Sequence, residues 1–330
     1  MSPALLADTV WVARRVLAMG TWLQLAVAGP DSATALAVSD SVVAEVARWE
    51  GWLTTWRSDS ELQRLNRAPV GTPVALRPEV AALLAELDGW VRATGGAFDP
   101  AVGPWIDAWD LRGRGRVPTA AARARAAAAA GWRHVRADGT GWVRLHPGVW
   151  LDSGAFGKGA ALRAVQGRLG AWGAWAARVD FGGQLLVWPR GPWAVAAADP
   201  RRRDRAAVAF ELPAGSASTS SASERFVRAS GRRWGHIVDP RTGTPVPAWG
   251  SVTVVDTDPL RADVLSTALF VMGPRVGRAW AEARGVAALF LVAGPAGRWQ
   301  VQTTPTFRAC CWPDGRHQAT NHTNRTEPWP

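Results

Sequence analysis

The spacing of apolar and polar residues predicts both strands and helices in the first half of the chain. Residues 10–28 alternate in part, which is typical of a strand. Apolar positions recur with helical spacing in residues 32–50, in residues 78–93 after a helix-starting proline, and in the Ala-rich residues 119–130. Residues 131–150 are expected to form two short strands around an Asp-Gly turn.

A loop is expected between the first two helices, at Trp56 to Leu62. Ser58 or Asp59 in this loop has the residue type that caps a short helix. A second loop is expected at residues 216–223, because they are almost all Ser, Thr and Ala. A solvated linker is the simplest interpretation of that segment.

The second half of the chain is expected to contain several strands before two consecutive helices and a closing hairpin. A double glycine, Gly182-Gly183, interrupts the first of these strands, and such a pair marks a bulge or the close approach of a ligand. The expected strands span residues 178–187, 193–198, 208–212 and 251–255, the helices residues 261–272 and 274–285, and the hairpin residues 287–303.

These elements lack regular β-α-β alternation, and no internal repeat is visible. The order favours an α+β fold with largely antiparallel sheets and packed helices, in one large two-lobed domain. We expect this domain to cover residues 1–308 and a polar, poorly ordered tail to cover residues 309–330.

Composition narrows the class of protein. Hydrophobic residues make up 48% and charged residues 20% of the chain, as in a globular protein. The net charge of +11 comes from arginines that are scattered along the chain. Basic and aromatic residues do not alternate in the way typical of a nucleic-acid-binding surface, so we do not expect nucleic acid binding. The chain has no Tyr, which excludes phenolic chemistry, and the adjacent Cys310 and Cys311 cannot supply a disulfide framework or a four-thiolate zinc site.

The chain shows no pattern that is typical of a secreted or membrane-spanning protein. Residues 14–25 combine two arginines with a Thr- and Gln-containing segment, unlike the uniform apolar core of a secretory signal. No apolar run reaches the length of about 18 residues that a transmembrane helix needs. A cytoplasmic location, with peripheral membrane association as an option, is therefore expected.

Lys158 is the most informative single residue, because the other 37 of the 38 Lys and Arg residues are arginines. Arginine stands in place of lysine everywhere else in the chain. We therefore expect that this one lysine is retained for its compact ammonium group. It lies in Leu151-Asp-Ser-Gly-Ala-Phe-Gly-Lys-Gly159, a Gly-rich loop that opens a helix and so suits a phosphate. A tight turn with a surface lysine is the simpler alternative.

Other candidate residues are weaker when each is considered alone. Asp99 precedes a proline and fits an ordinary turn. His236 and Asp239 lie in a short segment that is dense in polar side chains. Asp263 and Thr267 are four residues apart and share a helix face, which suits oxygen ligation of Mg²⁺ or Ca²⁺, although spacing alone favours a structural role.

Taken together and in order, these motifs resemble those of the FAD:protein FMN transferase family, the ApbE-like flavin transferases. The resemblance runs from about residue 16 to residue 303. Its pieces are Met19-Gly-Thr21, Gly96-Ala-Phe-Asp-Pro100, Leu151 to Gly159, Gly182-Gly183, Ser223-Glu-Arg-Phe226, His236 to Gly243 and Asp263 to Ala268.

The resemblance implies a T-fold-like architecture and Mg²⁺-dependent cleavage of FAD, in which FMN is transferred to a Thr or Ser of a target flavoprotein and AMP leaves. That target is often membrane-associated in the family, and the oligomeric state is expected to be a monomer or homodimer. Residues similar to FAD-contacting positions of the family are Met19, Trp56 (in place of the usual Tyr), Ala97, Phe98, Asp99, Asp152, Lys158 and Ile237.

The resemblance also implies a metal site and a set of catalytic residues. The metal ligands correspond to the Ala155 carbonyl, the Asp263 carboxylate, the Ser266 carbonyl and the Thr267 side chain. Lys158 would assist at the phosphates, and His236 or Asp239 is a candidate base for the acceptor hydroxyl.

Several positions depart from the family pattern. Gln184 stands where an Asp often follows the paired glycines, and Ser220-Ser-Ala-Ser223 replaces a more usual Ser-Gly-Asp-Tyr. An FAD-binding protein, or a pyrophosphatase that releases FMN and AMP without transfer, is therefore the alternative. A kinase-like phosphate enzyme is suggested only by Gly157-Lys158-Gly159 and is not favoured, because the spaced Gly-x-x-x-x-Gly-Lys-Ser/Thr pattern is missing.

Overall fold

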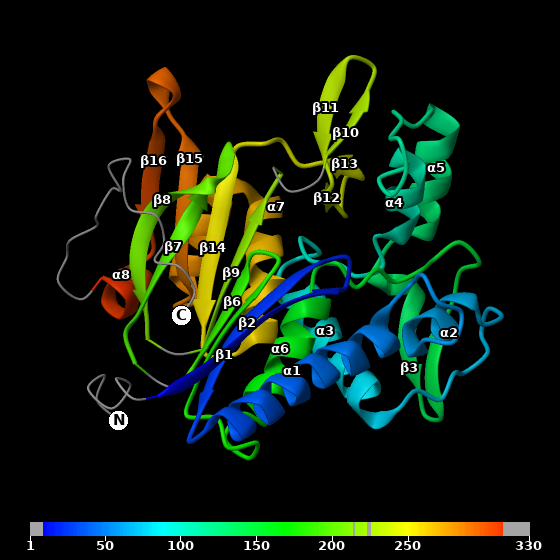
Figure 1. Ribbon diagram of the computed structural model, residues 1–330. Helices are drawn as coiled ribbons and strands as arrows, with labels where there is room; N and C mark the ends of the chain where they lie inside the picture. Colours follow the sequence, from blue (N-terminus) through cyan, green and yellow to red (C-terminus); the bar gives the residue numbers. More distant parts are fainter. Residues whose placement is uncertain (1–8, 190, 214, 223–225, 313–330) are drawn as a thin grey trace.

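The computed structural model describes residues 9–189, 191–213, 215–222 and 226–312. Its centre is an eight-stranded sheet in the order β1-β2-β5-β6-β9-β14-β15-β16, and every neighbouring pair is antiparallel (Figure 1). The expected α+β class with an antiparallel sheet is confirmed. The sheet strands are β1 (Val10–Ala18), β2 (Thr21–Gly29), β5 (Ala176–Phe181), β6 (Gln184–Trp188), β9 (Gly215–Ser221), β14 (Gly250–Asp256), β15 (Ala287–Ala293) and β16 (Trp299–Thr303).

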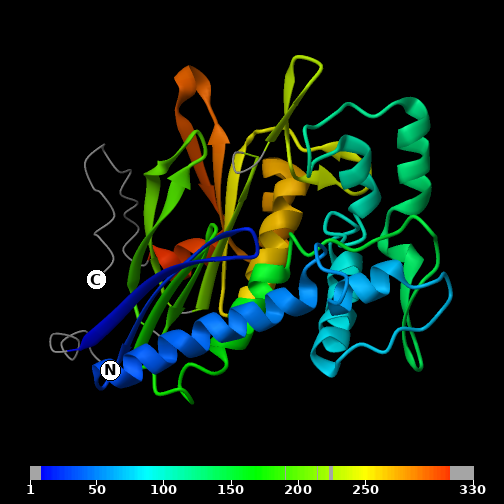
Figure 2. The same ribbon diagram turned by 45° about the vertical axis from the view of Figure 1, so that its right-hand side comes forward.

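Helices cover one face of the sheet, and a hairpin with a short helix covers part of the other (Figures 1 and 2). The first face carries α1, α6 and α7, whose apolar stripes pack on β2, β5, β9 and β14. The opposite face carries the β7–β8 hairpin and α8. The bounds are α1 (Ser32–Leu53), α6 (Gly157–Gln166), α7 (Pro259–Ala283), α8 (Pro305–Cys311), β7 (Trp193–Asp199) and β8 (Arg202–Leu212).

A second lobe lies beside the helical layer, at the right of Figure 1. Its α3 contributes Leu84 and Leu87 to the same buried cluster that contains the β2 and α1 side chains, so both lobes share one core. Small hairpins complete the fold near the sheet ends. The bounds are α2 (Glu61–Arg67), α3 (Pro78–Ala93), α4 (Gly103–Trp109), α5 (Ala120–Ala129), β3 (Val135–Asp138), β4 (Gly141–Arg144), β10 (Phe226–Ala229), β11 (Arg232–Gly235), β12 (Val238–Asp239) and β13 (Thr244–Pro245).

Two glycine-containing segments that the sequence places inside single strands are instead hairpin turns. Met19 and Gly20 both have positive φ, 45° and 71°, and connect β1 to β2. Gly182 and Gly183, with φ of 56° and 88°, connect β5 to β6. Consecutive residues of this conformation match the turn of a two-residue hairpin, so the chain reverses where alternation alone predicts continuation.

The prediction of a loop at residues 216–223 is wrong. Residues 215–221 form β9, which lies between β6 and β14 in the sheet and is largely buried. This segment consists almost entirely of Ser, Thr and Ala, so apolar and polar residues do not alternate along it. The alternation that identifies a strand is therefore missing from the sequence. The expected cap of α2 is also wrong, because Ser60, rather than Ser58 or Asp59, accepts a hydrogen bond from Gln63 N.

Helix α8 extends the folded part to Cys311, past the expected end of the domain at residue 308. Cys311 is fully buried beside Phe307, against β8 and β15. The rest of the predicted tail, from residue 313, lies outside the described residues. No helix in the described ranges combines the length and apolar character that crossing a membrane requires.

Candidate functional site

The loop before α6 is held at its start by contacts with distant segments. Leu151 N donates to Asn66 Oδ1 at 2.7 Å, and Asn66 Nδ2 donates back to the Leu151 carbonyl at 3.0 Å. Asp152 N donates to the Pro100 carbonyl at 2.8 Å. These bonds join the start of the loop to the second lobe and so fix the position of the glycines that follow Asp152.

Asp263 of α7 connects this loop to the sheet. Its side chain is nearly buried, and Lys158 Nζ donates to its Oδ1 at 3.3 Å while Gly159 N donates to its Oδ2 at 2.9 Å. Gly159 permits the contact, because a Cβ there would lie 2.7 Å from the Pro259 carbonyl oxygen. The structure thus brings together the lone lysine and the predicted metal carboxylate, about a hundred residues apart in sequence.

Hydroxyl groups of β9 contact the same carboxylate and two α7 side chains that follow it. Ser218 Oγ lies 3.2 Å from Asp263 Oδ1, and Ser220 Oγ lies 2.9 Å from Ser266 Oγ and 3.4 Å from Thr267 Oγ1. Sequence reasoning missed Ser218 and Ser220. The signal for them was the placement of serines at every second position, 216, 218 and 220, which puts all three on one strand face.

Gln184, the departure from the family pattern, lies under the start of α7. Its Nε2 donates to Ser216 Oγ at 3.1 Å and to the Pro259 carbonyl at 2.8 Å, while its buried Oε1 has no hydrogen-bond partner. The amide therefore ties β6 and β9 to the first turn of α7, the helix that carries Asp263.

A cleft lies over these groups, and it consists of two adjoining hollows of about 140 and 380 Å³. Asp152, Lys158, Gly182 and His236 line both hollows. The smaller hollow gathers most of the predicted positions, and Met19 lines the larger one. Those in the smaller hollow are Ala97, Phe98, Asp99, Asp152, Ala155, Lys158, His236, Ile237, Asp263 and Thr267.

Trp56 is not among the residues that line the cleft. Trp56 is 76% exposed, and its ring stacks against the Arg112 guanidinium, whose carbon lies 4.8 Å from the ring centre. Arg112 in turn forms an ion pair with Asp152 and stacks on Trp150 at 4.6 Å. Arg112, which sequence reasoning missed, therefore bridges Trp56 to the mouth of the cleft.

Asp99 lines the cleft, but its carboxylate is engaged with the backbone. Its oxygens accept hydrogen bonds from Ala101 N at 2.8 Å and Trp132 N at 2.9 Å. Burial raises the pKa of Asp99, and these two hydrogen bonds oppose the rise. The side chain therefore shapes the wall of the cleft by holding two loops together.

The two candidate bases differ in position. His236 lines both hollows, at the end of β11. Asp239 lines neither, and its two oxygens accept from Arg241 Nε and a terminal guanidinium nitrogen, both at 2.9 Å. Of the pair, only His236 is placed to reach a substrate in the cleft.

Oxygen atoms dominate the part of the cleft around Asp263. No cluster of three or more His, Cys, Asp or Glu side chains suited to a metal occurs within the described ranges. A metal beside Asp263 would therefore take hydroxyl and carbonyl oxygens as its other ligands, and Thr267 and Ala155 line the same hollow. This donor set fits a hard cation such as Mg²⁺.

Comparisons with known proteins agree with this arrangement. The curated FAD:protein FMN transferase of Vibrio cholerae is 30% identical over 271 residues, 79% of this chain and 80% of its own length. A second one, from Klebsiella pneumoniae, is 32% identical and covers 73% of this chain and 77% of its own length.

Solved structures share the fold over nearly the whole chain. The apo crystal structure of the Pseudomonas stutzeri flavinyl transferase ApbE has a TM-score of 0.80 at 31% identity, covering 92% of this chain and 97% of that one. The Thermotoga maritima ApbE protein has a TM-score of 0.84 at 26% identity, covering 91% and 99%. The model of the ApbE family matches residues 19–290, and the chain therefore belongs to the ApbE family.

Proposed function

We propose that this protein is an FAD:protein FMN transferase. A Thr or Ser hydroxyl of a target flavoprotein attacks the FMN phosphorus of FAD, a new phosphoester bond forms, the bond to AMP breaks, and the hydroxyl proton passes to a base. The observation that carries the proposal is that Lys158, Asp263 and Ser220 of β9 line one cleft, in which Lys158 is paired with Asp263. Curated relatives of similar length have the same activity in their names.

We assign the diphosphate of FAD to the part of the cleft beside the Gly-rich loop. Phosphoryl transfer depends mainly on positioning and on neutralising charge. Lys158 supplies a compact ammonium group, and its partner Asp263 holds it at the cleft. The rest of FAD would contact Met19, Ala97, Phe98, Asp152 and Ile237. Trp56 lies behind Arg112 and would contact only a part of FAD that extends past Arg112.

The Asp263 carboxylate and the Thr267 side chain would hold Mg²⁺, together with the carbonyls of Ala155 and Ser266. When bound there, the ion would neutralise phosphate oxygens and stabilise the leaving AMP. Ser266 fits a backbone role, because its own hydroxyl is bonded to Asp263 O at 3.0 Å and faces the β9 serines. A helical carbonyl keeps a second lone pair for such a contact.

His236 is the residue that we assign as base for the acceptor hydroxyl. His236 lines both hollows, which supports this role. The Asp239 carboxylate is instead occupied by its ion pair with Arg241. The cytoplasmic location and the monomeric or homodimeric state that the sequence suggests stay predictions.

The test incubates the protein with FAD, Mg²⁺ and a flavoprotein fragment that contains an acceptor Thr. Flavin fluorescence that stays with the denatured fragment, together with AMP release, is the expected result. A fragment with that Thr changed to Ala is the control and should stay unlabelled. FMN and AMP without labelled fragment would point to a pyrophosphatase, and bound but intact FAD would reject the enzymatic function.

A further inference from the structure

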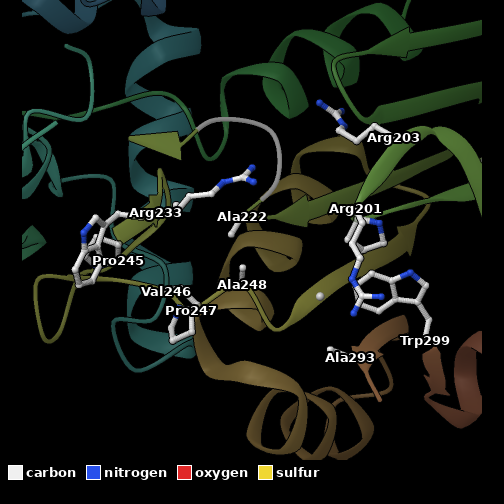
Figure 3. A pocket seen from close by; sticks show the side chains of 14 residues that line it. Arg201, Arg203, Ala222, Arg233, Pro245, Val246, Pro247, Ala248, Ala293 and Trp299 are labelled. Atoms are coloured by element: carbon white, nitrogen blue, oxygen red, sulfur yellow. The ribbon is translucent and has the colours of Figure 1, made fainter. Parts of the chain in front are cut away.

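A separate groove of about 640 Å³ lies at the ends of the sheet strands, outside the cleft (Figure 3). Ala222, which follows β9, and Ala248, which precedes β14, lie at its centre. Figure 3 shows Arg201 beside Trp299 on one side and Arg233 on the other. We call this hollow the arginine groove.

The arginine groove lies next to the cleft. Arg203 lines both the groove and the larger hollow of the cleft. Gly235 lines the groove while the next residue, His236, lines the cleft. Along β9, Ser220 lines the cleft and Ala222 the groove, and two residues of extended chain span about 7 Å. The two hollows are therefore close enough for one extended peptide of a few residues to reach from the groove to the cleft.

The charge of the groove has one sign. Three arginines line it, at positions 201, 203 and 233, and among the described residues no Asp or Glu lines it. Arg201 stacks on Trp299 at 4.3 Å and donates to the Gly297 carbonyl, while Arg233 stacks on Phe226 at 3.6 Å. Neither Arg201 nor Arg233 forms an ion pair with an acidic side chain of the described residues.

The Asp199 carboxylate, beside the start of the groove, is already engaged by other donors. Asp199 accepts from Arg201 N at 2.7 Å and from Trp299 Nε1 at 2.9 Å, and it does not line the groove. Because the stacked guanidinium groups of Arg201 and Arg233 are already held in place, an acidic ligand would lose little additional side-chain freedom on binding.

We propose that the arginine groove binds an acidic segment of the acceptor protein, adjacent in sequence to the Thr or Ser that receives FMN. This inference rests on the proposed function, and it adds the chemistry by which the partner is recognised. Carboxylates of the segment pair with Arg201 and Arg233 from opposite sides. The uncharged floor around Ala222 and Ala248 accepts the backbone and small side chains between them, which directs the hydroxyl toward His236.

The experiment compares two synthetic peptides that each contain one Thr, flanked by Asp and Glu in the first and by Asn and Gln in the second. Binding of the fluorescein-labelled peptides to the FAD-loaded protein is measured by anisotropy at low and high salt. FMN transfer to each peptide is measured separately. The variants are Arg201→Gln, Arg233→Gln and the double variant, and the matched control is Arg284→Gln, an exposed arginine stacked at 4.3 Å on Trp280 of α7.

We expect the wild-type protein to bind the acidic peptide more tightly than the neutral one, and this preference should weaken at high salt. The double variant should bind the acidic peptide roughly 3- to 20-fold more weakly, while Arg284→Gln binds it like the wild type. Arg201→Lys and Arg233→Lys should restore part of the affinity, because the charge returns without the planar stack.

Equal affinity for the two peptides, or equal losses in the double variant and in Arg284→Gln, would overturn the proposal. So would tighter binding of an oligothymidylate of the same charge, because the groove would then select nucleic acid. The two proposals can fail separately. Transfer without charge preference rejects the groove alone, whereas Arg-dependent peptide binding without transfer to any acceptor rejects the transferase function alone.

Discussion

Gly159 offers the sharpest test of how the site is assembled, because α6 packs there directly against the start of α7. A Cβ at this position would lie 2.7 Å from the Cβ of Asp263, 2.7 Å from the Pro259 carbonyl oxygen and 2.8 Å from the Cα of Leu260. Two of these three atoms belong to the backbone, so no side-chain rotation can relieve the overlap. The substitution Gly159→Ala must separate the two helices.

The expected cost follows from two opposing effects. Forcing a methyl group into a packed contact costs about 1–3 kcal/mol, and backbone neighbours place this site at the upper end. Replacing Gly by Ala inside a helix returns about 1 kcal/mol. We therefore expect Gly159→Ala to lower the free energy of unfolding by about 2 kcal/mol, and to lengthen the bond from residue 159 N to Asp263 Oδ2.

Gly89 in α3 is the matched control, because a Cβ there meets no atom within 4 Å. Gly89→Ala should stabilise the protein by up to about 1 kcal/mol, so the two variants shift the midpoint of urea unfolding, followed by circular dichroism, in opposite directions. FMN transfer should fall only in Gly159→Ala. If both variants were equally stable and active, the close contact between α6 and α7 would be refuted.

Three further predictions concern the charged groups of the cleft. Lys158→Arg should reduce FMN transfer and AMP release by about 10²-fold, because a planar guanidinium does not replace the compact ammonium beside Asp263, and an unchanged rate would show that the lone lysine is accidental. Asp263→Asn should abolish the response of FAD cleavage to added Mg²⁺ in a titration, and a normal response would exclude Asp263 as a ligand. Burial raises the pKa of Asp99, so its contribution to stability is complete below about pH 3.9 and is lost as the pH rises through its folded value. The wild-type advantage over Asp99→Asn in urea unfolding should therefore be largest below about pH 3.9 and shrink as the pH rises above it, and a constant difference would contradict this assignment.

Local spacing was sufficient to predict the main helices of the fold. Helix α6 buries Leu162 and Val165, as their spacing indicates, and α3 starts at Pro78 and ends at Ala93 as expected. Both helices are amphipathic, so their buried apolar residues recur in the sequence with the helical period of about 3.6 residues. The composition likewise singled out Lys158, and the structure places it on Asp263.

Other features could not be derived from local pattern. Strand β9 has no apolar alternation, and it is buried because Ser218 and Ser220 find partners on α7 some 45 residues later. The Asp99 carboxylate satisfies the amide of Trp132, and Asp239 pairs with Arg241 rather than facing the cleft. A polar side chain shows its residue type in the sequence, but its hydrogen-bond partner depends on which distant segment lies beside it.

The sequence by itself determined the helical stripes, the order of the family motifs and the selection of one lysine, because each is a property of neighbouring residues or of composition. Only the tertiary structure decided that Asp263 meets Lys158, that β9 is a central strand, and that Arg201 and Arg233 face each other across one groove. Burial and electrostatic fields depend on distances in space, and the antiparallel sheet sets these distances by pairing strands that lie far apart in the chain.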